Sequence, residues 1–63
     1  MKRLAEEMAS VLVQWGADLG DEREAVMTLL AAGYRGRIIA EMLDRALYRA
    51  RVLSAGAFEL ELT

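Results

Sequence analysis

The sequence predicts an all-α fold: a compact three-helix domain over residues 1–56, followed by a short extended or β-like tail over residues 57–63. Three observations support this prediction. Apolar residues recur at spacings of three and four in three segments, which is the period of an amphipathic helix. Glycines stand between these segments, where helices commonly end, and the chain has no proline. In the last residues apolar and polar positions alternate instead, as they do in a strand.

The first helix is expected over residues 2–19, with its apolar residues, Leu12 and Trp15 among them, on one face. Gly16 falls inside this segment. Because glycine costs about 1 kcal/mol in a helix interior, Gly16 either allows close packing of another helix or ends the helix early. Gly20 is the expected stop.

The second helix is expected over residues 22–32. Asp21 is a good N-cap, and Glu24 stands three residues later, as a capping box requires. Gly33 is the expected left-handed terminator of this helix.

The third helix is expected over residues 37–54, where apolar residues cover an arc of about 140°, and Gly56 is expected to end it. A strand-like tail over 57–63 would need a pairing partner, either a second copy or another protein. The alternative is an extended tail whose Phe58 fills a gap in the bundle. We expect five large side chains in the core: Leu12, Trp15, Leu30, Leu43 and Leu47.

Composition predicts a second subunit. The chain has 63 residues, and a domain of this size buries only about 60% of its unfolded surface. The absence of cysteine and histidine excludes disulfides and the usual structural zinc sites. The hydrophobic fraction is 56%, against about 45–50% in ordinary soluble domains. These features favour a homodimer. The alternative is an alanine-rich chain that packs closely without leaving apolar patches.

The sequence also predicts a cytoplasmic protein that does not enter a membrane. The absence of cysteine fits a reducing compartment. Glu6 and Glu7 interrupt any apolar core of a signal peptide. The longest uncharged runs, residues 8–17 and 25–34, fall well short of the roughly 20 residues that a membrane-spanning helix needs.

No enzymatic activity, cofactor or metal is expected. Without histidine and cysteine the chain lacks the commonest proton shuttle and the thiol nucleophile. Its carboxylates would need a cleft that shifts their pKa values, and a chain of this length is too small to build one alone. The acidic residues over 18–24 lack the spacing of a calcium-binding loop, and capping of the second helix accounts for them.

Charge is divided along the chain, with a net −3 over residues 1–33 and a net +3 over residues 34–56. Such asymmetry can mark a surface for a partner, and it can equally hold the two halves of the fold together. Arg35 and Arg37 stand at the start of the third helix, where a positive charge opposes the helix dipole. Simple solvation, or pairing with the acidic start of the second helix, is the alternative reading of these two arginines.

Arginine and tyrosine are frequent anchors of protein interfaces. The sequence therefore predicts a small protein-binding module that regulates or inhibits a larger partner. The predicted partner-binding surface is centred on the third helix and consists of Tyr34, Arg35, Arg37, Arg45, Tyr48, Arg49 and Arg51.

One alternative is a purely structural oligomer whose only role is assembly. The other is a dimeric regulator that binds nucleic acid. The segment 23–43 resembles the helix-turn-helix DNA-binding domains of LuxR-type response regulators. The resemblance is carried by Glu24, Val26, Leu29, Leu30, Ala31, Gly33, Ile39, Ala40 and Leu43. It implies a helix, a glycine turn and a stretch with the pattern of Ile39, Ala40 and Leu43, after which that family breaks and begins a separate recognition helix that reads DNA. The chain departs from that family at residues 44–47, where the third helix continues and no recognition helix with serine and threonine begins. An acidic chain is also unusual for a nucleic-acid-binding domain.

Overall fold

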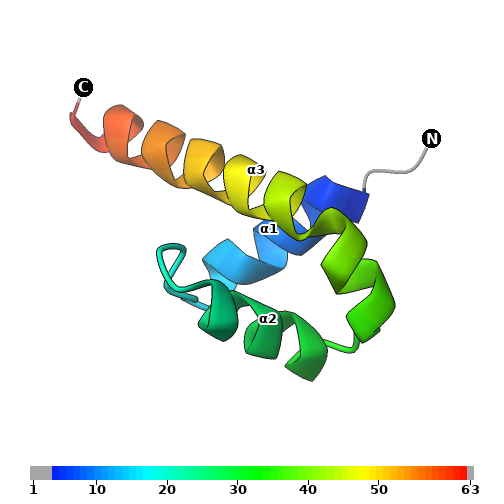
Figure 1. The fold of residues 1–63 in the computed structure, drawn as a ribbon. Helices are drawn as coiled ribbons and strands as arrows, with labels where there is room; N and C mark the ends of the chain where they lie inside the picture. The colour runs from blue at the N-terminus through cyan, green and yellow to red at the C-terminus, as the bar shows by residue number, and fades with distance from the viewer. Residues whose placement is uncertain (1–3, 63) are drawn as a thin grey trace.

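Three helices form where the spacing of apolar residues predicts them, and the all-α class is confirmed (Figure 1). A computed structural model describes the backbone of residues 4–62 and the side chains of residues 4–55. The helices are α1 (Leu4–Gln14), α2 (Glu22–Ala31) and α3 (Gly36–Leu62). Within this described part, α1 packs mainly against α3, and α2 lies across both.

The end of α1 differs from the prediction, because the helix stops at Gln14 and does not continue to residue 19. Gly16 adopts a left-handed backbone with φ +71°. The N–H of Gly16 donates to the carbonyl of Val13 at 3.2 Å, and the N–H of Ala17 donates to the carbonyl of Leu12 at 3.0 Å. This pair of bonds is a Schellman motif, which satisfies the last carbonyls of a helix. Of the two roles expected for Gly16, it therefore has the second: it ends the helix early.

The boundaries of α2 agree with the prediction. The Asp21 carboxylate accepts from the N–H groups of Arg23 and Glu24, at 3.1 and 3.3 Å, so Asp21 is the N-cap. Glu24 does not complete a capping box. Its carboxylate instead accepts from the N–H of Asp18 at 2.9 Å, which ties the preceding loop to the helix. Gly33 has φ +104° and is the left-handed terminator that the sequence predicts.

The extended tail predicted after residue 56 is wrong for the described residues, because α3 continues through Gly56 to Leu62. Six residues of alternating character are too few to distinguish a strand from a helix. Leucine and glutamate, which make up most of this segment, are strong helix formers. A glycine costs about 1 kcal/mol within a helix, so it does not by itself stop one. The side chain of Phe58 and the last residue lie outside the description.

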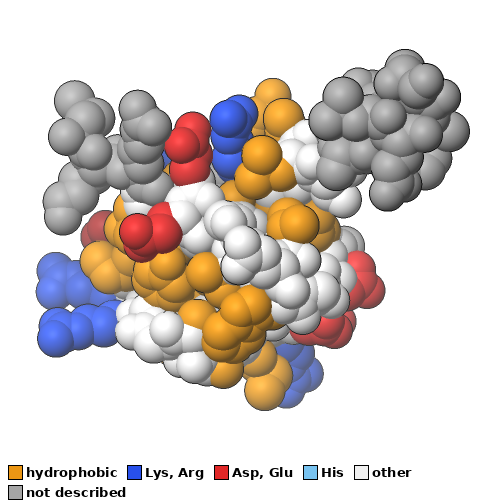
Figure 2. Space-filling model, turned by 180° about the vertical axis from the view of Figure 1, so that it is seen from behind, with side chains coloured by type: hydrophobic (Ala, Val, Ile, Leu, Met, Phe, Trp, Pro, Cys, Tyr) orange, Lys and Arg blue, Asp and Glu red, His pale blue; other side chains and the backbone are white. Residues whose placement is uncertain are grey.

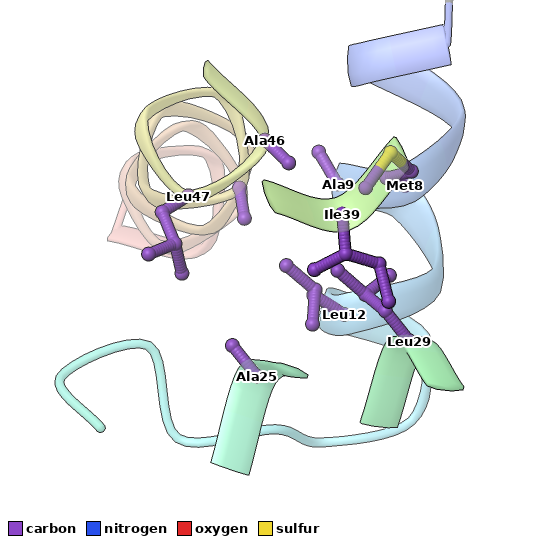
Figure 3. Close-up of a cluster of buried hydrophobic side chains, with 9 residues drawn as sticks. Met8, Ala9, Leu12, Ala25, Leu29, Ile39, Ala46 and Leu47 are labelled. Atoms are coloured by element: carbon purple, nitrogen blue, oxygen red, sulfur yellow. The ribbon is translucent and has the colours of Figure 1, made fainter. Parts of the chain in front are cut away.

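The core lies where the three helices meet. Leu12, Leu29 and Ile39 come from three different helices and point toward one another (Figure 3). Fully buried alanines on α1 and α3 let these two helices pack closely. The buried residues are Met8, Ala9, Leu12, Ala25, Leu29, Ile39, Ala46, Leu47 and Ala50.

The predicted core is partly correct. Leu12 and Leu47 are buried, and Leu43 is half-buried. Trp15 and Leu30 were expected in the core but are exposed. Trp15 is exposed because the chain has already left α1 at this point. Leu30 is exposed because α2 buries the face that carries Ala25 and Leu29, and Leu30 lies beside that face.

The length of α3 gives the molecule its shape. At 1.5 Å per residue, α3 is about 40 Å long, whereas α1 and α2 are each only about 15 Å long. The C-terminal part of α3 therefore extends past the other helices (Figure 1). Residues 51–55 are all exposed, whichever way they point around the helix. Among residues 4–62, no helix combines the length and apolar character that crossing a membrane requires.

Candidate interaction surfaces

The arginine and tyrosine residues predicted to bind a partner fall into three groups in the structure. Tyr34, Arg49 and Arg51 contact other parts of the same chain. Arg35 and Arg37 are exposed at the start of α3. Arg45 and Tyr48 are exposed on the outer side of α3. The structure therefore does not bring all seven together on one free surface.

Tyr34 connects the α2–α3 turn to α1. It directly follows the glycine that ends α2, and its N–H donates to the carbonyl of Leu29 at 3.1 Å. Its hydroxyl donates to the Glu7 carboxylate at 3.1 Å. Partial burial of the phenol raises the pKa of Tyr34, and the hydrogen bond and negative charge of Glu7 raise it further. Tyr34 is therefore a structural contact between two elements that are far apart in the sequence.

Arg49 and Arg51 tie α3 to the first half of the chain. The Arg49 guanidinium lies 3.5 Å from the Glu6 carboxylate, and both side chains are about half exposed. The Arg51 guanidinium donates to the carbonyl of Leu19, in the loop between α1 and α2, at 3.0 Å. A pair as exposed as that of Arg49 and Glu6 contributes about 0–1 kcal/mol. Arg49 and Arg51 therefore join α3 to the first half of the chain, and the exposed ion pair adds little to the stability of the fold.

Arg45 and Tyr48 keep their side chains outside the bundle. Tyr48 is 68% exposed. Together with Val52 they occupy positions i, i+3 and i+7, which share one side of a helix. Val52 and its neighbour Leu53 are 40% and 39% exposed although both are large and apolar. We call the exposed side chains Tyr48, Val52 and Leu53 of α3 the α3 arm.

A second exposed apolar surface lies on α2, and the sequence analysis missed it. Trp15 and Met27 are 55% and 62% exposed, and they line a shallow groove of about 470 Å³ with Thr28, Ala31 and the charged residues Asp21, Arg23 and Glu24. Leu30, 49% exposed, is one turn from Met27 on the same helix. The signal that could have revealed this surface is Gly16, because ending α1 there removes Trp15 from the core face.

The Asp18, Asp21 and Glu24 carboxylates accept hydrogen bonds from backbone N–H groups of the same segment, residues 18–24. Asp21 and Glu24 accept the N–H bonds described above, and the Asp18 carboxylate accepts from the N–H of Gly20 at 2.9 Å. In the part of the chain that the structure describes, no group of three or more carboxylates is arranged to hold a metal ion.

One face of the molecule carries apolar surface with charged side chains around it. Figure 2 shows hydrophobic side chains across the middle of this face. Basic side chains project on the side where α2 leads into α3, with acidic side chains above them, and acidic side chains project on the opposite side with a basic one beside them (Figures 1 and 2). No protein-family model, curated protein or solved structure matches the chain.

Proposed function

We propose that the chain is a small, non-enzymatic protein-binding module of the cytoplasm that docks its α3 arm into a groove on a larger protein, which it regulates or inhibits. The observation that carries the proposal is the exposure of Val52 and Leu53 on a helix that extends past the body of the fold. Residues 51–55 are exposed on every side of the helix, and Val52 and Leu53 keep about 40% of their surface in water. Full burial of a valine or leucine side chain contributes about 1.5–3 kcal/mol, so a partner's groove would stabilise the arm.

The arm has the pattern of a helix that binds in a groove. Such helices use anchors at spacings of three, four and seven residues along one side. Arg45, Tyr48 and Val52 have this spacing, and arginine and tyrosine are the residue types most often found at the centre of interfaces. The partner that fits is a protein with an apolar groove for Tyr48 and Val52 and a carboxylate opposite Arg45.

The alternative function, binding of nucleic acid, has less support from the contacts. Each neutralised phosphate requires a cation. Arg49 is paired with Glu6, and Arg51 is bonded to the carbonyl of Leu19. These contacts reduce the positive charge that α3 offers to a phosphate backbone.

Comparative capture tests the proposal. The full chain, Val52→Glu and Tyr48→Ala are immobilised and exposed to a lysate of the native host, and captured proteins are identified by mass spectrometry. The matched control is Ala40→Glu, which adds the same charge at an exposed position of α3 outside the arm. A partner should bind the unchanged chain and the control and be lost with both arm variants. Circular dichroism checks that each variant keeps its helices.

Equal capture by all four chains would place the partner elsewhere and refute the role of the arm. Titration of duplex DNA and RNA at increasing salt tests the alternative function. Nucleic-acid binding at physiological salt, lost when Arg35 and Arg37 become glutamate, would replace the proposal with the alternative.

A further inference from the structure

The exposed surface of α2 has an arrangement that the proposed function does not use. Its apolar members are on α2 and at the end of α1, and we call them the α2 face: Trp15, Met27, Leu30 and Ala31. A half-exposed tryptophan beside a largely exposed methionine leaves apolar area in water, and patches of this kind mark binding surfaces. The groove between Trp15 and α2 gives the face a hollow that side chains of an occupant can enter.

Opposite charges lie at the two ends of this face. At the start of α2 is an acidic edge, made of Asp18, Asp21, Glu22 and Glu24 around the single cation Arg23, all exposed. Just beyond the end of α2 is a basic edge, made of Arg35 and Arg37, also exposed. Arg23 is one turn before Met27 and lines the groove, where Asp21 and Glu24 outnumber it. The α2 face therefore runs from a net negative end to a positive end along the axis of α2, with Met27 close to its middle.

We propose that a second copy of the chain covers the α2 face, with the two α2 helices antiparallel around a two-fold axis that passes close to Met27. In a two-fold interface the same patch occurs on both subunits and pairs with itself. Reversing the direction of α2 places the acidic edge of each copy against the basic edge of the other, so both ends of the interface are attractive. The apolar middle of the face meets its own counterpart, and the groove of each copy receives side chains of the partner's α2.

The size of the molecule is compatible with this interface. A stable dimer buries about 800 Å² on each partner, which is about a sixth of the 4795 Å² surface of the chain. Burying Trp15, Met27 and Leu30 removes three of the largest exposed apolar side chains at once. This second copy binds away from the α3 arm, so the dimer and the docking function are separate proposals.

Sedimentation equilibrium of the full chain at micromolar concentration is the first test. It should give twice the 7.0 kDa mass of the chain. Met27→Glu puts a charge at the centre of the interface and should give the monomer mass, whereas Val52→Glu, on the α3 arm, should leave the dimer intact. Trp15 is the only tryptophan, so its fluorescence should shift to the red as the unchanged chain is diluted, and in Met27→Glu it should be red at every concentration.

Charge reversal tests which edges meet. The variant Arg35→Glu/Arg37→Glu turns the basic edge acidic, and Glu22→Lys/Glu24→Lys turns the acidic edge basic. Each should be monomeric alone, because like charges then face each other at both ends. Mixed in equal amounts they should form a heterodimer, because attraction is restored at both ends. Circular dichroism checks that both variants are folded.

The proposal is overturned if the unchanged chain is monomeric at micromolar concentration, or if its dimer survives Met27→Glu. Failure of the two reversed variants to associate with each other while folded would also overturn the antiparallel arrangement. None of these outcomes depends on whether the α3 arm captures a partner.

Discussion

Replacing Gly16 by alanine tests how much the left-handed backbone at the end of α1 contributes to the free energy of unfolding. The backbone of Gly16 has φ +71°, a conformation that costs an L-residue about 1–2 kcal/mol. No heavy atom lies within 4 Å of the position a Cβ would take, so a clash adds nothing to this penalty. Alanine also reduces the freedom of the unfolded chain, which offsets about 0.4–1 kcal/mol. We therefore expect Gly16→Ala to lower the free energy of unfolding by about 1 kcal/mol.

Thermal unfolding followed by circular dichroism measures this difference. For a domain of this size, 1 kcal/mol corresponds to a fall in Tm of roughly 4–8 °C. Gly16→Asn should lose less, because asparagine tolerates the left-handed conformation. The matched control is Gly36→Ala, at the first residue of α3, where space is also open and φ is not positive. This control should leave Tm unchanged or raise it.

The opposite result at Gly16 would contradict the structure of the α1–α2 connection. If Gly16→Ala were more stable than the unchanged chain and gained helix content, α1 would extend beyond Gln14 toward Leu19, as its apolar spacing alone predicts. A loss at Gly16 together with an equal loss at Gly36 would show that the effect does not come from the left-handed backbone.

Two further predictions concern the core and the Tyr34 contact. Leu12→Ala, at a fully buried position, should lower the free energy of unfolding measured in urea by about 2–5 kcal/mol. Leu43→Ala, at a half-buried position, should lower it by clearly less. Equal losses would contradict the packing of α3. Because the pKa of Tyr34 is raised above 10.0 in the folded state, the folded chain holds this proton more tightly than the unfolded chain. Stability from this group is complete below pH 10 and is lost as pH rises through the folded pKa. Tyr34→Phe should show a shallower fall of Tm above pH 10, and an unchanged slope would rule out the contact with Glu7.

Local signals in the sequence were sufficient for α2 and insufficient for α1. The cap at Asp21 and the terminator at Gly33 act on neighbouring residues only, so both can be predicted from residue type. Gly16 has two physically reasonable roles, and the choice between them depends on how the following loop packs. Whether Trp15 is buried or exposed depends on whether Gly16 ends α1. The groove on α2 could therefore not be predicted while the role of Gly16 was open.

The predicted partner-binding residues on α3 show the same limit, because their roles depend on contacts with residues far away in the sequence. Arg45 and Arg49 are one turn apart on α3, and residue type gives no reason to assign them different roles. Arg49 lies against α1, where Glu6 is its partner, whereas Arg45 faces outward. Such a pairing joins residues 43 positions apart in the sequence, and helical periodicity carries no information about it. Tyr34 and Glu7 are a second pair of this kind.

The two proposed surfaces have a joint consequence. A two-fold dimer formed through the α2 face carries two α3 arms, so a partner with two grooves would meet both at once. Binding of the second arm is then intramolecular, and the overall affinity can exceed that of one arm by about 10²–10⁴ when the spacing of the grooves allows it. Capture of such a partner would depend on the concentration of the chain, because dilution separates the dimer. Met27 would therefore influence partner binding through the dimer, although it lies outside the α3 arm and needs no contact with the partner.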